Sequence, residues 1–169
     1  MKAPILSLAF VVGAIFVVSA TGAEKYKDPS LSVEVRIADL LPRLTLEEKI
    51  TLLGGDDTGF NGSGVERLGI PPIRMSDGPV GVRSGASTAF PVSINMAAAW
   101  DMDLIYRYGI ALGEETRAKG KTCILGPCVG IHRFPLNGRN FESFGEDPFL
   151  TSRLTVNTIK HLHYAESAD

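Results

Sequence analysis

Residues 76–83 place a carboxylate and a guanidinium around a segment that must turn. Two glycines and one proline separate Asp77 from Arg83, and these residue types favour a turn over the start of a helix. A carboxylate on a rigid turn can accept hydrogen bonds from two vicinal hydroxyl groups, such as those of a sugar. We expect Arg83 to return toward Asp77 and orient it. The alternative is an aspartate that caps its own turn beside a solvated arginine.

A second segment, residues 126–148, is rich in aromatic, arginine, asparagine and acidic side chains without a helix or strand pattern. Loops of this length inside a compact domain are usually functional. Phe134, Phe141 and Phe144 would supply apolar walls. Arg139 would offer a fork of N–H donors to hydroxyl groups or to the carboxylate of the first segment.

The same loop also has a purely structural interpretation. Phe141 and Phe144 could be core residues, and Glu142 and Asp147 could serve as ion-pair partners or helix caps. The sequence leaves these alternatives open.

Three helices are predicted around the two segments. The first spans about residues 45–53 and opens with a capping box. The second lies between Asp101, a candidate N-cap, and Gly120, with apolar residues recurring on one face. The third begins with Asp147-Pro148, a cap followed by proline at the first helical position.

Residues 73–75 and 122–125 are predicted as short strands, each ahead of one of the two polar segments. Short strands separated by helices of this length indicate βα units, and hence a parallel sheet or barrel. Active sites of such folds lie in the loops after the strands, so we expect both segments to face one site.

The first 23 residues have the parts of a signal peptide. Lys2 is positive, residues 5–18 are almost entirely apolar, and cleavage would fit after Ala20 or Ala23. The apolar run is shorter than the roughly 20 residues that span a bilayer. We therefore expect a protein that is secreted, or periplasmic in a bacterium, and free of the membrane after cleavage.

Charge and length limit what the mature chain can be. Removal of residues 1–23 leaves 146 residues with 16 basic and 19 acidic side chains, a formal charge of −3. Nothing basic enough for a nucleic acid partner remains. A complete eight-fold β/α barrel needs roughly 200 to 250 residues. The mature chain is therefore too short to form such a barrel by itself.

Two smaller features have open interpretations. Cys123 and Cys128 could form a strained local disulfide or remain as buried thiols, and no metal-binding pattern accompanies them. The glycine-rich residues 54–64 predict a surface loop, because a phosphate-binding loop would need Gly-Lys-Ser/Thr. Asn61 begins a glycosylation sequon in that loop.

Residues 76–83 and 135–148 resemble, in order and spacing, the N-terminal barrel domain of family-3 glycoside hydrolases. The pattern is more similar to the β-glucosidase branch than to the β-xylosidase branch, and the similarity runs from about Leu40 to Leu154. The resemblance implies an α/β fold over residues 24–169. These residues would be the first βα units of a partial (β/α)8 TIM-like barrel that is incomplete at its C-terminal side.

The resemblance also implies roles for three residues. Asp77 would bind hydroxyl groups of the sugar at the non-reducing end, with Arg83 and Arg139 in the same subsite. It implies no cofactor and no metal.

Family members are retaining enzymes, which use a carboxylate nucleophile and a carboxylic acid about 5 Å apart. By resemblance, both lie downstream of Asp169, so we expect no catalytic residue in this chain. Nothing supports Asp77 and Glu142 as a substitute pair. The family also has a Lys-His pair in the sugar subsite, but Lys160-His161 follows Asp147 too closely. We expect it on the exposed surface of the third helix.

The expected function is release of β-linked glucose from the non-reducing ends of glucans or glycosides, by a parent protein of which this chain alone is inactive. The alternatives are a catalytically inactive carbohydrate-binding fragment and an unrelated secreted βα domain. The carbohydrate assignment requires Asp77 and Arg139 to converge on one sugar ring.

Overall fold

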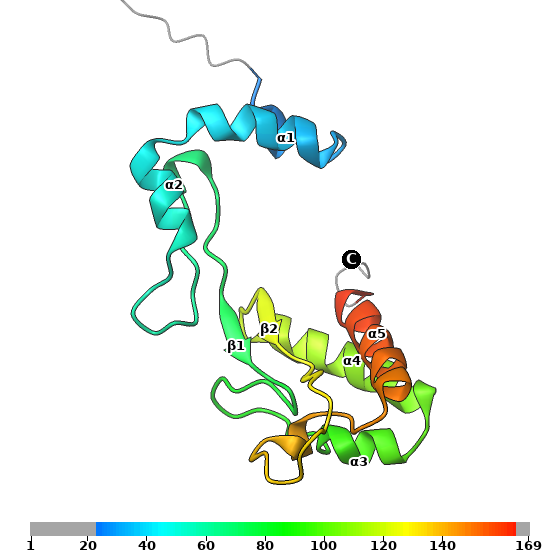
Figure 1. Cartoon of the computed structure of the whole chain (residues 1–169). Coiled ribbons are helices and arrows are strands. Elements are labelled where there is room, and N and C mark those ends of the chain that lie inside the picture. Colours follow the sequence, from blue (N-terminus) through cyan, green and yellow to red (C-terminus); the bar gives the residue numbers. More distant parts are fainter. Residues whose placement is uncertain (1–22, 165–169) are drawn as a thin grey trace, which may run out of the picture. The chain divides into compact units, whose positions relative to one another are not determined.

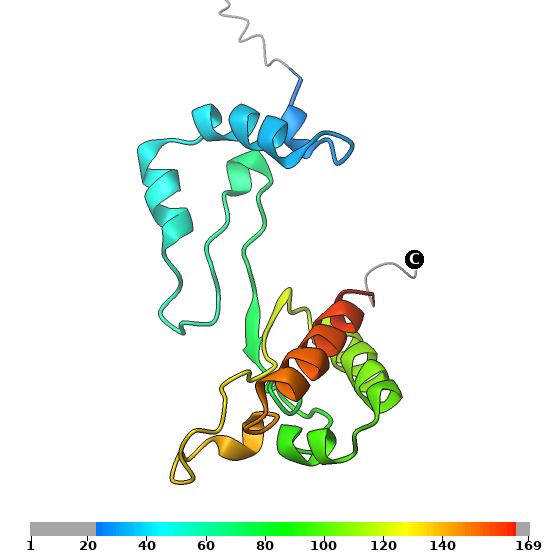
Figure 2. The same ribbon diagram turned by 45° about the vertical axis from the view of Figure 1, so that its right-hand side comes forward.

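The computed structural model describes residues 23–164. They form two compact units, and the boundary along the chain lies between Thr45 and Leu46. Figure 1 shows the course of the chain, and Figure 2 shows it in a turned view. The predicted signal peptide, apart from Ala23, lies outside the described residues. Within residues 23–164, none of the helices has the length and apolar character needed to cross a membrane.

The first unit contains one α-helix between two short 3-10 turns. These elements are η1 (Lys25–Lys27), α1 (Val33–Leu40) and η2 (Leu41–Arg43). Asp39 connects them, because Oδ2 accepts a hydrogen bond from the Tyr26 backbone at 3.1 Å and Oδ1 accepts one from Arg43 at 2.9 Å. The N-cap Ser32 begins α1 by accepting from the backbone N–H of Val35.

The second unit contains the elements that carry both polar segments. In chain order they are α2 (Leu46–Leu53), η3 (Glu66–Leu68), β1 (Met75–Asp77), α3 (Ser93–Ala98), α4 (Met102–Ala118), β2 (Cys123–Leu125), η4 (Asn140–Glu142) and α5 (Pro148–Tyr164). The three helices expected from the sequence are therefore confirmed as α2, α4 and α5.

Local capping explains where the two long helices begin. Asp101 Oδ1 accepts from the backbone N–H groups of Asp103 and Leu104 at 2.9 and 3.0 Å, at the start of α4. Asp147 Oδ1 does the same at the start of α5, accepting from Phe149 and Leu150 at 2.7 and 3.1 Å. Both aspartates thereby satisfy backbone donors that have no partner inside the helix.

The two strands pair in parallel, with Met75 opposite Cys123 and Asp77 opposite Leu125. Because α3 and α4 connect them, β1 and β2 form a βαβ arrangement, and the predicted α/β class is confirmed. The first strand was expected at residues 73–75, which is wrong by two residues. Ile73 contacts the glycine-rich loop instead, where Gly62 N–H donates to Ile73 O at 2.7 Å.

An apolar cluster packs the loops after both strands against the helices. It contains residues from the loops after both strands and from α3, α4 and α5, namely Val82, Met96, Ala97, Ile105, Tyr108, Leu112, Phe144 and Leu154. Figure 1 and Figure 2 both show α4 and α5 side by side, and Gly109 permits this close approach. A Cβ at Gly109 would lie 2.8 Å from the Thr158 carbonyl oxygen.

Two smaller predictions concern the cysteines and the Lys-His pair. Cys123 and Cys128 are free thiols, so no local disulfide forms, but both are half-buried and not fully buried as that alternative had it. Lys160 lies exposed on α5, as expected. His161 is instead half-buried, with its ring 4.3 Å from the ring of Tyr106, because α5 packs against α4.

Candidate functional site

A backbone hydrogen bond joins the two ends of the loop after β1. Asp77 is the last residue of β1, and the Arg83 N–H donates to the Asp77 carbonyl oxygen at 2.9 Å. Gly81 makes the turn possible, since its φ is +130° and an added Cβ would lie 2.3 Å from the Thr88 carbonyl oxygen. Asp77 and Arg83 are consequently held next to each other.

Helices α3 and α4 anchor the middle of this loop. The hydroxyl groups of Tyr108 and Ser93 donate to the Pro79 carbonyl oxygen at 3.1 and 3.4 Å, and both bonds are buried. Burial raises the pKa of Tyr108 to about 12. Its hydroxyl group therefore remains a neutral hydrogen-bond donor throughout the physiological pH range.

The loop after β2 is anchored by backbone pairing and by one aromatic side chain. Cys128 and Ser143 form a parallel bridge, which lays the start of the loop against its end. Asn140 Nδ2 donates to the Phe134 carbonyl oxygen at 3.0 Å, and Phe144 is only 2% exposed in the apolar cluster. The 3-10 turn η4 is therefore fixed from both sides.

Four charged side chains connect the two loops. Arg83 Nη1 lies 3.7 Å from Asp77 Oδ2, and Arg83 Nη2 donates to Glu142 Oε1 at 2.9 Å. Arg139 Nε donates to the other oxygen, Glu142 Oε2. We call Asp77, Arg83, Arg139 and Glu142 the ion-pair cluster.

The members of the ion-pair cluster differ in their access to solvent. Side-chain exposure is 36% for Asp77, 50% for Arg83 and 62% for Arg139, but 3% for Glu142. The hydrogen bond and charge of Glu142, with a smaller contribution from Asp77, raise the pKa of Arg139. The cluster is formally neutral, and it presents one carboxylate and two guanidinium groups to a ligand.

This arrangement can recognise a ligand that carries several hydroxyl groups. A carboxylate accepts hydrogen bonds and a guanidinium donates them, so the exposed members of the cluster complement vicinal hydroxyls. Among residues 23–164, no group of three His, Cys, Asp or Glu side chains could hold a metal ion. The fold and site thus define an α/β protein with a polar binding cluster at the ends of parallel strands.

The structure brings together the three residues singled out in the sequence, Asp77, Arg83 and Arg139. Arg83 returns toward Asp77 as expected, whereas Arg139 pairs with Glu142 and not with Asp77. The sequence left Glu142 as a possible partner or cap, and its contact with both arginines was missed. Its position three residues after Arg139 was the available signal.

The aromatic residues of the second loop have separate environments. Phe144 is a core residue, whereas Phe134 and Phe141 are exposed, so the core interpretation of Phe141 is wrong. Asp147 is a helix cap, as the structural interpretation had it.

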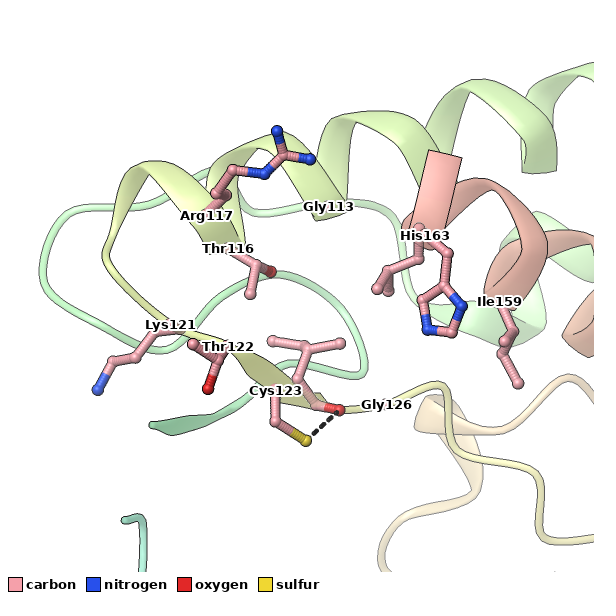
Figure 3. A pocket seen from close by; sticks show the side chains of 11 residues that line it. Gly113, Thr116, Arg117, Lys121, Thr122, Cys123, Gly126, Ile159 and His163 are labelled. Atoms are coloured by element: carbon pink, nitrogen blue, oxygen red, sulfur yellow. Dashed lines mark hydrogen bonds between the residues drawn. The ribbon is translucent and has the colours of Figure 1, made fainter. Parts of the chain in front are cut away.

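A cavity of about 690 Å³ lies away from the ion-pair cluster, between β2 and the C-terminal parts of α4 and α5. Figure 3 shows Thr116 and Arg117 of α4 on one side of it, with Ile159 and His163 of α5 on the other. None of the four cluster residues lines this cavity.

Comparison with known proteins identifies the family. The model of the glycosyl hydrolase family 3 N-terminal domain matches residues 61–168. A β-glucosidase of Bacteroides ovatus is 46% identical over 149 residues, which cover 80% of this chain and 20% of that protein. β-Glucosidase B of Emericella nidulans is 49% identical over 133 residues, covering 75% and 16%. The chain belongs to glycosyl hydrolase family 3.

Solved structures agree with this assignment. The β-glucosidase of Kluyveromyces marxianus in complex with glucose superposes with a TM-score of 0.71 at 39% identity, over 76% of this chain and 16% of that one. A β-glucosidase of Streptomyces venezuelae in complex with D-glucose gives 0.71 at 37% identity, over 77% and 18%. The chain spans about a fifth or less of the length of these relatives. An unrelated βα domain with coincidental motifs is therefore excluded.

Proposed function

We propose that this chain is the N-terminal part of a retaining β-glucosidase and supplies part of its sugar subsite. Asp77, Arg83 and Arg139 bind hydroxyl groups of the glucose unit at the non-reducing end. The observation that carries this proposal is the convergence of an exposed carboxylate and two exposed guanidinium groups at the ends of β1 and β2. β-Glucosidases among the relatives, two of them solved with glucose, support glucose as the sugar.

The two reacting carboxylates are proposed to lie in later segments of the protein, downstream of Asp169. Glu142 is a poor candidate for either role, since its side chain is 3% exposed and both of its oxygens bind arginines. A retaining mechanism would need a nucleophile and an acid about 5 Å apart at the anomeric carbon. Asp77 and its arginines would orient the sugar for that attack.

We further propose that β1 and β2 are the first two parallel strands of a (β/α)8 barrel over residues 24–169 and beyond. The parallel pairing of β1 with β2, with α3 and α4 between them in the chain, supports this, because a (β/α)8 barrel is built from such βαβ units. Residues 1–23 would direct secretion to the extracellular space or periplasm. N-terminal sequencing of the mature protein would then begin at Thr21 or Glu24.

The proposal is tested on the complete protein encoded by the gene, assayed with an aryl β-glucoside. We expect turnover with retention of the anomeric configuration. NMR of the first product formed measures that configuration. Asp77→Asn removes an acceptor charge, so kcat/KM should fall about a hundredfold or more.

Asp57→Asn is the matched control, because Asp57 is exposed in the glycine-rich loop. Its kcat/KM should equal that of the unchanged protein. Equal kcat/KM for Asp77→Asn and Asp57→Asn would contradict a sugar-binding role for Asp77.

The second candidate is a carbohydrate-binding fragment without activity. It is favoured because both oxygens of Glu142 bind arginines, which leaves the ion-pair cluster without a pair of reacting carboxylates. Residues 24–169 expressed alone should hydrolyse nothing. We also expect them to aggregate, because each strand of the two-stranded sheet lacks a second strand neighbour and α5 exposes Phe149, Val156 and Ile159. A cooperatively melting monomer that binds glucose in a calorimetric titration would favour the fragment over the enzyme.

A further inference from the structure

We propose that Glu142 is a positioning residue, which does not touch the sugar but holds Arg83 and Arg139 in the orientation that binds it. This inference rests on the proposed function. It adds a residue that neither the motif nor the proposed sugar contacts assign.

The contacts of Glu142 divide evenly between the two arginines. Oε1 accepts from Arg83, which lies 59 residues away in the chain, and Oε2 accepts from Arg139 in the same 3-10 turn. The side chains of Arg83 and Arg139 are 50% and 62% exposed, whereas the Glu142 side chain is buried. A ligand can therefore reach the arginines but not the carboxylate that holds them.

Glu142 is itself held in place by the surrounding backbone. Its N–H donates to the Arg139 carbonyl oxygen at 3.0 Å, and the next residue, Ser143, pairs with Cys128. Phe144 follows and lies in the apolar cluster. Arginine side chains lose conformational entropy when they become ordered, so a fixed carboxylate that orders them in advance lowers the cost of binding.

The distances indicate a second effect, on Asp77. Arg83 is 2.9 Å from Glu142 but 3.7 Å from Asp77, beyond hydrogen-bond range. By attracting Arg83, Glu142 leaves the Asp77 oxygens available to accept from sugar hydroxyls. Without Glu142, the Arg83 guanidinium would be free to approach Asp77 and occupy those acceptor sites.

The first test replaces Glu142 in the complete protein and measures kcat/KM on an aryl β-glucoside together with glucose binding by calorimetry. Glu142→Gln removes the charge and leaves one acceptor, so kcat/KM and glucose affinity should each fall on the order of ten- to a hundredfold. Glu142→Asp keeps the charge but is one methylene shorter, so it cannot reach both arginines and should give a smaller loss.

A double-mutant cycle with Arg139→Ala separates positioning from general support of the fold. If Glu142 acts through the arginines, its replacement should cost at least threefold less in the Arg139→Ala protein than in the unchanged protein. Glu142→Asp takes the place of Glu142→Gln in the cycle if the glutamine variant does not fold. If the fold-losses in kcat/KM of the two single variants simply multiply in the double variant, the inference is overturned.

Glu48→Gln is the control. Glu48 also forms an ion pair with an arginine, Arg67, at 2.7 Å, but it is not a member of the ion-pair cluster. Its kcat/KM should stay within twofold of the unchanged protein. Absence of turnover and of glucose binding in the unchanged protein would overturn the proposed function and this inference together. An active protein with an additive cycle would overturn the positioning role alone.

Discussion

Carboxylates organise two regions of the second unit, the glycine-rich loop and the ion-pair cluster, over very different sequence distances. Asp56 in the glycine-rich loop accepts four hydrogen bonds, from the backbone and side chains of Thr58 and Asn61, two to five residues away. In the ion-pair cluster, the Arg83–Glu142 bond joins residues 59 apart. A local network shapes one loop, whereas a long-range network brings two loops into one site.

The two networks also differ in their surroundings. The residues of the Asp56 network lie at the surface, and hydrogen bonds from Asn61 and then Thr58 lower the pKa of Asp56 to about 2. Glu142 is buried beside a core residue, Phe144. The comparison indicates that the surface loop depends on itself, while the site depends on the packing beneath it.

The largest expected effect concerns that packing. Phe144→Ala should lower the free energy of unfolding by about 3–5 kcal/mol, because it removes a buried aromatic ring and leaves a cavity. Phe60→Ala in the glycine-rich loop should cost less than about 1 kcal/mol, since Phe60 is exposed. Urea unfolding of the complete protein measures both changes in unfolding free energy. Equal changes would remove the distinction between the glycine-rich loop and the region of the ion-pair cluster.

Two glycines, Gly81 in the loop after β1 and Gly59 in the glycine-rich loop, extend the comparison to the backbone. Gly81→Ala should cost about 2–4 kcal/mol, because strain at positive φ is combined with a clash against the Thr88 carbonyl oxygen. Gly59→Ala has strain at φ +71° but open space around the new Cβ, so it should cost about 1–2 kcal/mol. Melting temperatures that rank the two variants in the opposite order would show that the turn after β1 is not tightly constrained.

The smallest expected effect is the pH dependence of the Asp56 network. The folded state lowers the Asp56 pKa from 3.8 to about 2, so it binds protons less readily than the unfolded chain does. This contribution to stability is present above pH 3.8 and is lost as the pH falls toward 2. The difference in melting temperature between the unchanged protein and Asp56→Asn should therefore narrow between pH 6 and pH 2.5. A difference independent of pH would contradict this role of Asp56.

The outcome of the sequence predictions follows the same division between local and long-range contacts. The starts of α4 and α5 were predicted correctly, because Asp101 and Asp147 cap them through residues two or three positions away. The start of β1 was placed two residues too early, because pairing with a distant strand decides it. Phe141 and Phe144 are three residues apart, yet only Phe144 is buried.

The sequence by itself determined helices α2, α4 and α5, the α/β class and, through two motifs in register, the family. It also pointed to Asp77, Arg83 and Arg139 as side chains for a polyhydroxylated ligand. It did not predict α1 or α3. Only the tertiary structure decided that Glu142 connects the two arginines. Capping and turn formation depend on neighbours along the chain, whereas a buried ion pair across 59 residues exists only after β1, β2 and the apolar cluster have brought both loops together.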